Sequence, residues 1–320
     1  MNRIISIAPM MSYSDPHFRM LARLLTRHTL LYTEMITTAE LLHGKRSHLL
    51  HYNAQEHPLA LQLGGSDPNE LARCAKMGED LGYDEVNLNV GCPSSRVQSA
   101  QWGACLMKQP ETVAEGVAAM LQAVTLPVTV KTRIGVDHLD TYENLHHFVH
   151  TVASAGCHIF ILHARKAWLQ GLNPKKNRSI PPLRYETVYQ LKRDFPELTI
   201  VINGGIKTID EMKSHLTQVD GVMIGREAYS NPLLMASFDR EFYQQEQAEL
   251  SHPKMILQQY LPYVSAQLAR GVKLRYMTRH LLGLFQGKPG AKRWRHYLST
   301  QDDPNRQGIG VIEAVMEFFN

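Results

Sequence analysis

The chain has 320 residues and a mass of 36.3 kDa, with 44% hydrophobic and 20% charged residues. This length predicts two domains, or one large α/β barrel with an appendage. The composition excludes a disordered chain, a collagen-like repeat and a membrane protein, because no apolar run reaches the roughly 18 residues that a spanning helix needs. The apolar stretch at the N-terminus is broken by Ser6 and Pro9, so we expect no secretory signal and a cytoplasmic location.

Cysteine and histidine spacing indicates no metal centre. The four cysteines are too few and too scattered for a disulfide framework, and no CxxC or HExxH spacing occurs. His146, His147 and His150 have helical spacing that could mimic a metal face. Since they lack a carboxylate partner, we interpret them as ordinary helix residues and expect free thiols and no metal.

The net charge of +4 is mild, but its distribution along the chain is uneven. Residues 144–185 and 251–301 contain no Asp or Glu and carry several Lys and Arg. Such runs can be ordinary solvated faces, although those usually mix both signs for solubility. Two long stretches without acids instead favour a polyanionic partner, with nucleic acid as the candidate.

Eight short β-rich runs recur along the chain and predict the architecture. They span residues 4–10, 30–35, 58–65, 85–93, 127–135, 159–165, 199–205 and 221–227. Helix-like segments lie between most of them, with start signals at 67–70 and 208–211. Alternating strands and helices of this kind predict a (β/α)8 TIM barrel with its helices outside. Beyond Tyr243 only helical spacing remains, so we expect a barrel domain at 1–242 and a small all-helical domain at 243–320.

Period-2 patterns indicate which side chains face the barrel interior. In 127–135, Val128 and Val130 share one face and suit the helix layer, so Lys131 and Arg133 point inward. The same alternation turns four further polar residues inward near strand ends: Gln62, Asn89, His163 and Asn203. Any one of them could be a satisfied core group. Together they predict a polar pocket at the carboxyl end of the barrel.

Two glycine turns follow the last two predicted strands. One contains Asn203, Gly204 and Gly205, and the other contains Gly225 and Arg226. Backbone N–H groups from these loops can converge on one anion, which predicts a phosphate site. Because neither GxGxxG nor GxxxxGK[ST] occurs, a mononucleotide cofactor is favoured over a dinucleotide.

These motifs resemble those of the tRNA-dihydrouridine synthase family. Ala8-Pro9-Met10, Gln62-Leu63-Gly64-Gly65, the NxNxGCP motif at 87–93, Lys131-Thr132-Arg133, His163-Ala164-Arg165 and the two glycine turns occur in the family's order. The match spans the whole chain, and the Tyr13-Ser14-Asp15 segment and the length are most similar to the bacterial A-type enzymes. The resemblance implies a flavoprotein oxidoreductase that reduces uridine in the tRNA D-loop, at position 20, 20a or both. FMN is the implied cofactor and NADPH the reductant, with NADH as an alternative.

The resemblance also implies which residues bind the cofactor. The implied FMN-binding residues are Pro9, Met10, Met11, Gln62, Lys131, Arg133, His163, Asn203, Gly204, Gly205, Gly225 and Arg226. An inward ammonium at Lys131 suits the flavin edge that becomes negative on reduction. Whether His163 contacts the flavin, the substrate or both stays open.

Reduction of the uracil C5–C6 bond needs a hydride at C6 and a proton at C5. Cys92 fits the acid, since it lies in a Gly-Cys-Pro turn just beyond the inward Asn89, which is placed to bond the uracil edge. Cys74 and Cys157 are interpreted as packing residues, and Cys105 receives no role.

Two basic segments are the expected tRNA contacts, and a monomer that binds no membrane is expected. The contact residues are Lys175, Lys176, Arg178 and Ser179, and then Lys292, Arg293 and Arg295. Among them, Lys176, Ser179 and Arg293 are implied by the family resemblance. Trp294 lies within the second group and would offer an aromatic surface between cations.

Two alternative functions share some of these features. A flavin dehydrogenase for a small dihydropyrimidine or dihydroorotate would use the phosphate site and Lys131, but would not need the acid-free stretches. A non-catalytic tRNA-binding protein on the same barrel would carry no flavin. Salt-sensitive tRNA binding and the colour of the purified protein separate these alternatives.

Overall fold

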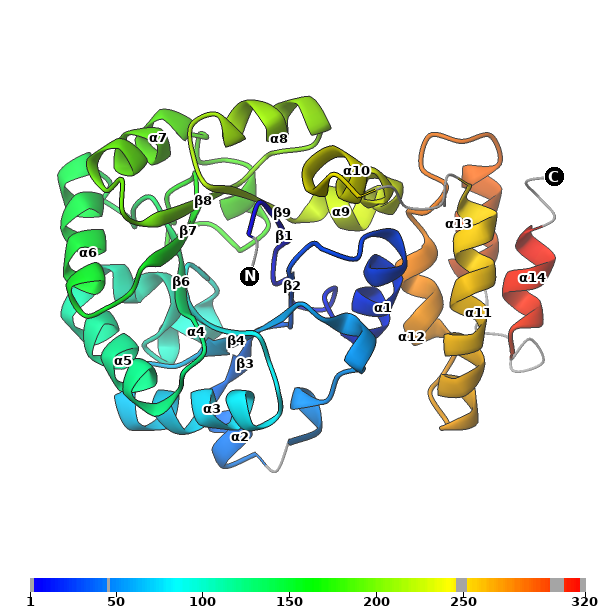
Figure 1. Ribbon diagram of the computed structural model, residues 1–320, viewed down its shortest axis with the longest axis horizontal. Coiled ribbons are helices and arrows are strands. Elements are labelled where there is room, and N and C mark those ends of the chain that lie inside the picture. The colour runs from blue at the N-terminus through cyan, green and yellow to red at the C-terminus, as the bar shows by residue number, and fades with distance from the viewer. Residues whose placement is uncertain (1–2, 45–46, 246–251, 300–307, 317–320) are drawn as a thin grey trace. The chain divides into compact units, whose positions relative to one another are not determined.

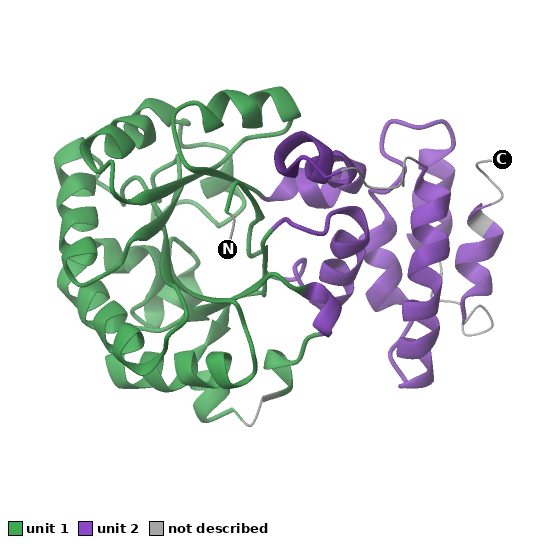
Figure 2. Ribbon diagram, in the orientation of Figure 1, with its two compact units in different colours: residues 1–11, 30–52, 57–224 green, residues 12–29, 53–56, 225–320 purple. Residues whose placement is uncertain are grey.

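The computed structural model describes residues 3–44, 47–245, 252–299 and 308–316. Within these ranges no helix is long and apolar enough to cross a membrane. The chain divides into two compact units, coloured separately in Figure 2. The first unit comprises residues 1–11, 30–52 and 57–224, and the second comprises residues 12–29, 53–56 and 225–320.

The first unit is built on a closed barrel of parallel strands (Figure 1). Its strands are β1 Ile5–Ile7, β2 Leu31–Tyr32, β3 Ile36–Thr37, β4 Leu59–Gly64, β5 Glu85–Val90, β6 Val128–Arg133, β7 Ile159–His163, β8 Thr199–Asn203 and β9 Gly221–Ile224. The order is β1-β9-β8-β7-β6-β5-β4-β2, and β3 also pairs with β4. A parallel bridge between Ser6 and Leu30 closes the circle. The predicted TIM barrel is confirmed, and each of the eight β-rich runs contains a strand.

Helices alternate with the strands of the first unit. They are α2 Thr38–Leu42, α3 Pro68–Asp80, α4 Ser95–Ser99, α5 Pro110–Ala123, α6 Tyr142–Ser154, α7 Tyr185–Asp194 and α8 Ile209–Leu216, with short 3-10 helices η1 Ser47–Leu50, η3 Gly103–Lys108 and η4 Lys176–Arg178. The Asp67 side chain accepts from the N–H of Glu70 at the start of α3. Thr208 and Glu211 form a capping box at the start of α8. Both predicted helix starts are therefore confirmed.

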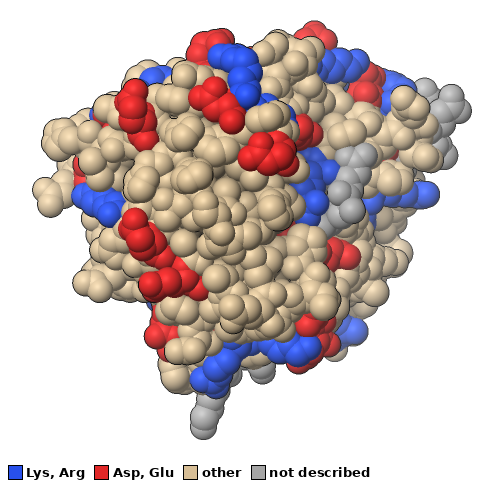
Figure 3. Space-filling model, turned by 60° about the vertical axis from the view of Figure 1, so that its left-hand side comes forward, with Lys and Arg blue, Asp and Glu red and all other residues tan. Residues whose placement is uncertain are grey.

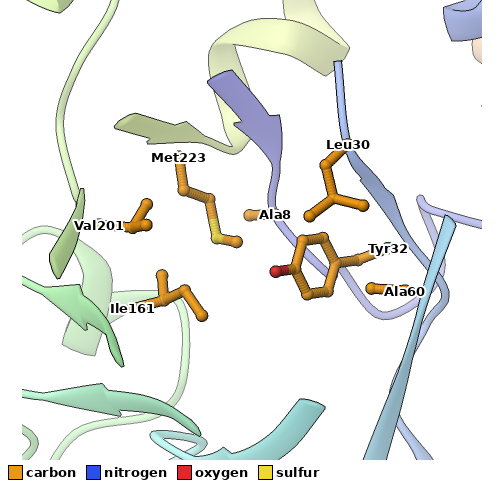
Figure 4. Packing of buried hydrophobic residues seen from close by; sticks show 7 residues of the cluster. All are labelled: Ala8, Leu30, Tyr32, Ala60, Ile161, Val201 and Met223. Atoms are coloured by element: carbon orange, nitrogen blue, oxygen red, sulfur yellow. The ribbon is translucent and has the colours of Figure 1, made fainter. Parts of the chain in front are cut away.

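A small apolar cluster occupies part of the barrel interior (Figure 4). Its residues are Ala8, Leu30, Tyr32, Ala60, Ile161, Val201 and Met223. Side chains two positions apart share a face of a strand, so the next inward position on β4, β7 and β8 is polar. Gln62, His163 and Asn203 occupy those positions. The apolar cluster thus forms the floor below the polar end of the barrel.

The second unit is helical and includes an early segment of the chain. Its helices are α1 Pro16–Leu25, α9 Arg226–Ser230, α10 Phe238–Tyr243, α11 Pro253–Ala269, α12 Arg275–Thr278, α13 Ala291–Ser299 and α14 Gly310–Met316, with 3-10 helices η2 Ala54–Glu56, η5 Pro232–Ser237 and η6 Arg279–Leu281. Asp15 caps α1 by accepting from the N–H of Phe18 at 3.0 Å. Its carboxylate also pairs with His280 at 2.9 Å and with Arg279. This buried acid ties the start of α1 to helix η6.

Candidate active site

The inward polar residues of the barrel lie together at the carboxyl ends of its strands. Asn89 is the cross-strand partner of Lys131, and His163 is the partner of both Arg133 and Asn203. The Lys131 Nζ donates to Asn203 Oδ1 at 3.2 Å. Asn89 Nδ2 donates to Gln62 Oε1 at 3.0 Å. These inward residues therefore form a polar layer at the carboxyl end of the barrel, as the alternation predicts, and the layer is two positions deep on β6, where Lys131 precedes Arg133.

Burial of the Lys131 side chain disfavours its charged form. Burial, together with the charge of the neighbouring Arg133, lowers the pKa of Lys131 to about 7, although the nearby Cys92 acts in the opposite direction. Burial also lowers the pKa of Arg133, to about 10, so that side chain stays charged at neutral pH. A bound anion would raise the pKa of Lys131 again, because an opposite charge stabilises the ammonium. The layer is therefore suited to hold a group that carries or acquires negative charge.

The turn that carries Cys92 is fixed through its backbone. The N–H groups of Gly91 and Cys92 both donate to Asn89 Oδ1 at 3.0 Å. The Cys92 carbonyl accepts from the N–H of Ala104 at 2.9 Å, and the Gly91 carbonyl accepts from Arg133 Nε at 2.9 Å. Cys92 itself is half-buried. Its turn therefore holds a half-buried cysteine on a backbone bonded on several sides.

The other cysteines are poor candidates for proton transfer. Cys74 and Cys157 are buried, and burial raises the pKa of each thiol to about 12. Cys105 donates to the carbonyl of Trp102, and burial raises its pKa as well. Within the described ranges, no group of three or more His, Cys, Asp or Glu side chains could hold a metal ion.

Arg133 has a structural role that the sequence did not suggest. Its Nε bonds Gly91 in the Cys92 turn, and its Nη1 donates to the carbonyls of Lys166 and Asn177 at 3.0 and 3.1 Å. Asn177 is fully buried, and its side chain bonds Trp168 and Leu172 within its own loop. One guanidinium therefore connects the turn after β5 to the basic loop after β7. In the sequence, the signal for this buried residue was Asn177, an uncharged side chain within a run of Lys and Arg.

The glycine turn after β8 fits a bound phosphate-bearing group. Gly204 and Gly205 have φ of +119° and +77°, which side chains other than glycine rarely adopt. A Cβ at Gly204 would lie 2.9 Å from His163 Cδ2, and one at Gly205 would lie 2.6 Å from Leu183. The backbone here must stay bare, as close approach of a ligand requires. Binding of the phosphate of a mononucleotide flavin by this turn, together with the cationic layer, stays a prediction.

The remaining implied cofactor residues lie at chain positions next to the barrel strands. Pro9 and Met10 are half-buried after β1, where Met10 packs against the apolar floor, and Met11 is 54% exposed. Gly225 and Arg226 follow β9 in the chain and belong to the second unit. The convergence of their turn with the Gly204 turn on one anion stays a prediction.

Both predicted basic segments present exposed side chains. Lys175, Lys176, Arg178 and Ser179 are exposed in and around η4, and Lys292, Arg293 and Arg295 are exposed on α13. On the face drawn in Figure 3, by contrast, Lys and Arg lie among Asp and Glu. These two segments, with one sign of charge only, suit a polyanion better than a face with mixed signs.

The expectation that Trp294 offers an aromatic surface is wrong. Trp294 is fully buried, donates through Nε1 to the carbonyl of Leu281 at 2.8 Å and packs on Phe285 at 4.7 Å between ring centroids. It lies on one face of α13 with Ala291 and Leu298, which are also buried. That spacing of three and four residues forms the core side of the helix, so the cations occupy the opposite side.

Comparison with known proteins agrees with this site. The family model described as "Dihydrouridine synthase (Dus)" matches residues 6–320. Similar relatives named "tRNA-dihydrouridine(20/20a) synthase" occur in Shewanella oneidensis (56% identity, 99% of this chain, 94% of the relative), in Synechocystis (59%, 98% and 93%) and in Escherichia coli K12 (54%, 98% and 90%). The chain therefore belongs to the dihydrouridine synthase family.

Proposed function

We propose that this protein reduces the C5–C6 bond of a uridine in tRNA to give 5,6-dihydrouridine, and that Cys92 supplies the proton for C5. The observation that carries the proposal is the Cys92 turn itself. It holds a half-buried cysteine at the cationic end of a barrel, in a chain whose relatives bear the name of this activity. Positions 20 and 20a of the D-loop are the proposed targets, as in the names of those relatives.

The cofactor that we propose is FMN, re-reduced by NADPH. Gln62, Lys131, His163, Asn203 and the Gly204 turn would hold it. When bound, FMN supplies the hydride for C6 of the base.

The protein's own residues handle the proton. Transfer from the Cys92 thiol to C5 leaves a thiolate, and the hydride that goes to C6 balances the added proton. Asn89 accepts from the N–H of Cys92, and Arg133 donates to the carbonyl of Gly91. These bonds hold the turn in place, which favours the transfer because the reacting group stays positioned.

A matched pair of cysteine variants tests the assignment. We expect Cys92→Ala to lower dihydrouridine formation roughly 10²- to 10⁴-fold, the usual range for a lost general acid. Flavin reduction by NADPH should remain at the parent rate, because it does not use the thiol. Cys105→Ala is the control and should keep full activity. Full turnover with Cys92→Ala would remove this residue from the mechanism.

The basic segments are proposed to bind the tRNA backbone. Phosphate contacts release counterions, so affinity should fall steeply with salt. Reversal of Lys292, Arg293 and Arg295 to Glu should raise KM for tRNA and flatten that salt dependence, with NADPH oxidation unchanged. A matched reversal of exposed residues on α3, α7 and α8 (Arg73, Arg193 and Lys213) should change KM little. Equal effects of the two triple variants would argue against a binding role for α13.

A further inference from the structure

A continuous line of hydrogen bonds runs inside the barrel from the Cys92 turn to a buried carboxylate. After the two backbone N–H groups that donate to Asn89 Oδ1, Asn89 Nδ2 donates to Gln62 Oε1 at 3.0 Å. Gln62 Nε2 donates to Asn87 Oδ1 at 2.7 Å, and Asn87 Nδ2 donates to Thr129 Oγ1 at 2.8 Å. Thr129 donates to Glu85 Oε1 at 2.6 Å. We call this line the relay.

Both ends of the relay impose the same direction on it. Glu85 is fully buried and can only accept while it is ionised, and Arg3 pairs with its other oxygen at 3.0 Å. Tyr32 also donates to it, at 2.7 Å. Thr129 has one hydroxyl proton, which goes to Glu85, so its oxygen must accept from Asn87. At the far end, the backbone N–H groups can only donate to Asn89.

Shape alone would not select this arrangement. The oxygen and nitrogen ends of an Asn or Gln amide are almost equal in size, so packing does not distinguish the two orientations. If Gln62 turned over, its NH₂ group would face the NH₂ group of Asn89, and both would lose an acceptor in a buried site. The backbone N–H groups that hold Asn89 exclude that state from one end of the line, and the chain of partners that ends on Glu85 excludes it from the other.

We propose that Glu85 is a positioning residue: its buried charge acts from one end of the line, and the N–H groups of the turn act from the other, to fix the amide orientations of Asn87, Gln62 and Asn89. Through Asn89, Glu85 then helps to hold the Cys92 turn for proton delivery. The inference rests on the proposed role of Cys92. It adds a residue at the opposite end of strand β5 that touches neither substrate nor cofactor.

Variants of Thr129 interrupt the relay while Glu85 and Asn89, at its two ends, keep their own side chains. Thr129→Val keeps the side-chain shape but removes the hydroxyl, whereas Thr129→Ser keeps the hydroxyl and should restore the relay. Tyr32→Phe is the matched control, because it removes a donor from the same Glu85 oxygen and a neighbour of the Thr129 hydroxyl, while every bond of the relay keeps both of its partners. Misplacement of a reacting group costs rate steeply, so we expect Thr129→Val to lower kcat for dihydrouridine formation roughly tenfold, with KM for tRNA unchanged.

Hydrogen exchange gives a reading that does not depend on activity. The amides of Gly91 and Cys92 should exchange about tenfold faster in Thr129→Val, since Asn89 holds them less firmly. The amides of β8 should exchange at the parent rate, which distinguishes a loosened turn from general destabilisation. Thr129→Ser and Tyr32→Phe should match the parent protein in both readings.

Glu85→Gln provides a second, independent variant. Arg3 can only donate, so the introduced carbonyl would turn to Arg3 and the introduced NH₂ would face Thr129. Thr129 would then accept there and donate to Asn87, and the reversal would travel along the line to a clash between Gln62 and Asn89. The same faster exchange at Gly91 and Cys92 is expected, again with unchanged exchange in β8.

The outcomes separate this inference from the proposed function. If Cys92→Ala abolishes turnover while Thr129→Val and Glu85→Gln change neither exchange nor kcat, the relay is refuted and the role of Cys92 stands. If Cys92→Ala keeps full turnover, the proposed function fails. Faster exchange in Thr129→Val and Glu85→Gln would then show only that the relay stabilises the Cys92 turn. Equal effects of Tyr32→Phe and Thr129→Val would also refute the relay.

Discussion

Replacement of Arg133 tests whether one side chain holds two loops of the site. Arg133→Met keeps most of the apolar stem but removes the hydrogen bonds to Gly91, Lys166 and Asn177. Three bonds from a charged donor, at about 1.5 kcal/mol each, amount to about 4.5 kcal/mol. Relief from burying a cation, whose pKa burial lowers to about 10, offsets part of that loss. We expect a local loss of about 2 kcal/mol.

Hydrogen exchange measures this loss where it occurs. A loss of about 2 kcal/mol corresponds to about thirtyfold faster exchange of protected amides. The N–H groups of Asn177 and Arg178, which donate to Asn173 and Lys175, should show it together with those of the Cys92 turn. Arg133→Lys should be intermediate, because an ammonium retains the charge but cannot reproduce the planar fork. Parent-like exchange in both loops of Arg133→Met would refute the connection between them.

Three further outcomes follow from the geometry and the pKa shifts. Gly204→Val should lower the affinity for FMN roughly tenfold, because the new Cβ would clash with His163. Fluorescence titration measures this affinity, and it should change far less in Gly171→Val, where a Cβ meets nothing within 4 Å. Because the pKa of Lys131 lies near 7, the free protein must take up a proton to bind an anionic flavin above that pH. The Kd of FMN should therefore rise up to about tenfold per pH unit above pH 7, and it should not change with pH in Lys131→Met. A Kd that does not change with pH in the parent protein would contradict this. Burial raises the pKa of Asp15, but hydrogen bonds from His280 and the other partners of Asp15 outweigh this and lower the pKa to about 2. The ionised carboxylate should therefore add about 2 kcal/mol to the free energy of unfolding above pH ~4, and this should disappear as the pH falls through about 2. In unfolding experiments, Asp15→Asn should destabilise the protein at pH 7 and hardly at pH 2.

The fold and the polar layer were predictable because both rest on local periodicity. Alternation within single strands placed Gln62, Lys131 and Asn203 inward before any tertiary contact was known. The same alternation in β5 places Glu85 on the face of Asn87 and Asn89, but nothing in one strand shows which partners ionised Glu85 would meet.

Features that depend on contacts between distant segments were not predictable. The bonds of Arg133 depend on where the loops after β5 and β7 turn back, which no local pattern encodes. The prediction of an exposed Trp294 is wrong because, in a helix with charges on several sides, the sequence does not reveal which side packs against the core. That residues 12–29 join the helical second unit likewise follows from long-range packing.

Mass spectrometry of oligonucleotide fragments from a treated tRNA tests the central proposal most directly. An unmodified tRNA transcript would be incubated with the protein, FMN and NADPH, then digested and analysed. We predict that a D-loop uridine at position 20 or 20a becomes heavier by two hydrogen atoms, and that Cys92→Ala abolishes this change while NADPH still reduces the flavin. Unaltered uridine in the tRNA, with NADPH oxidised by the parent protein, would contradict the account.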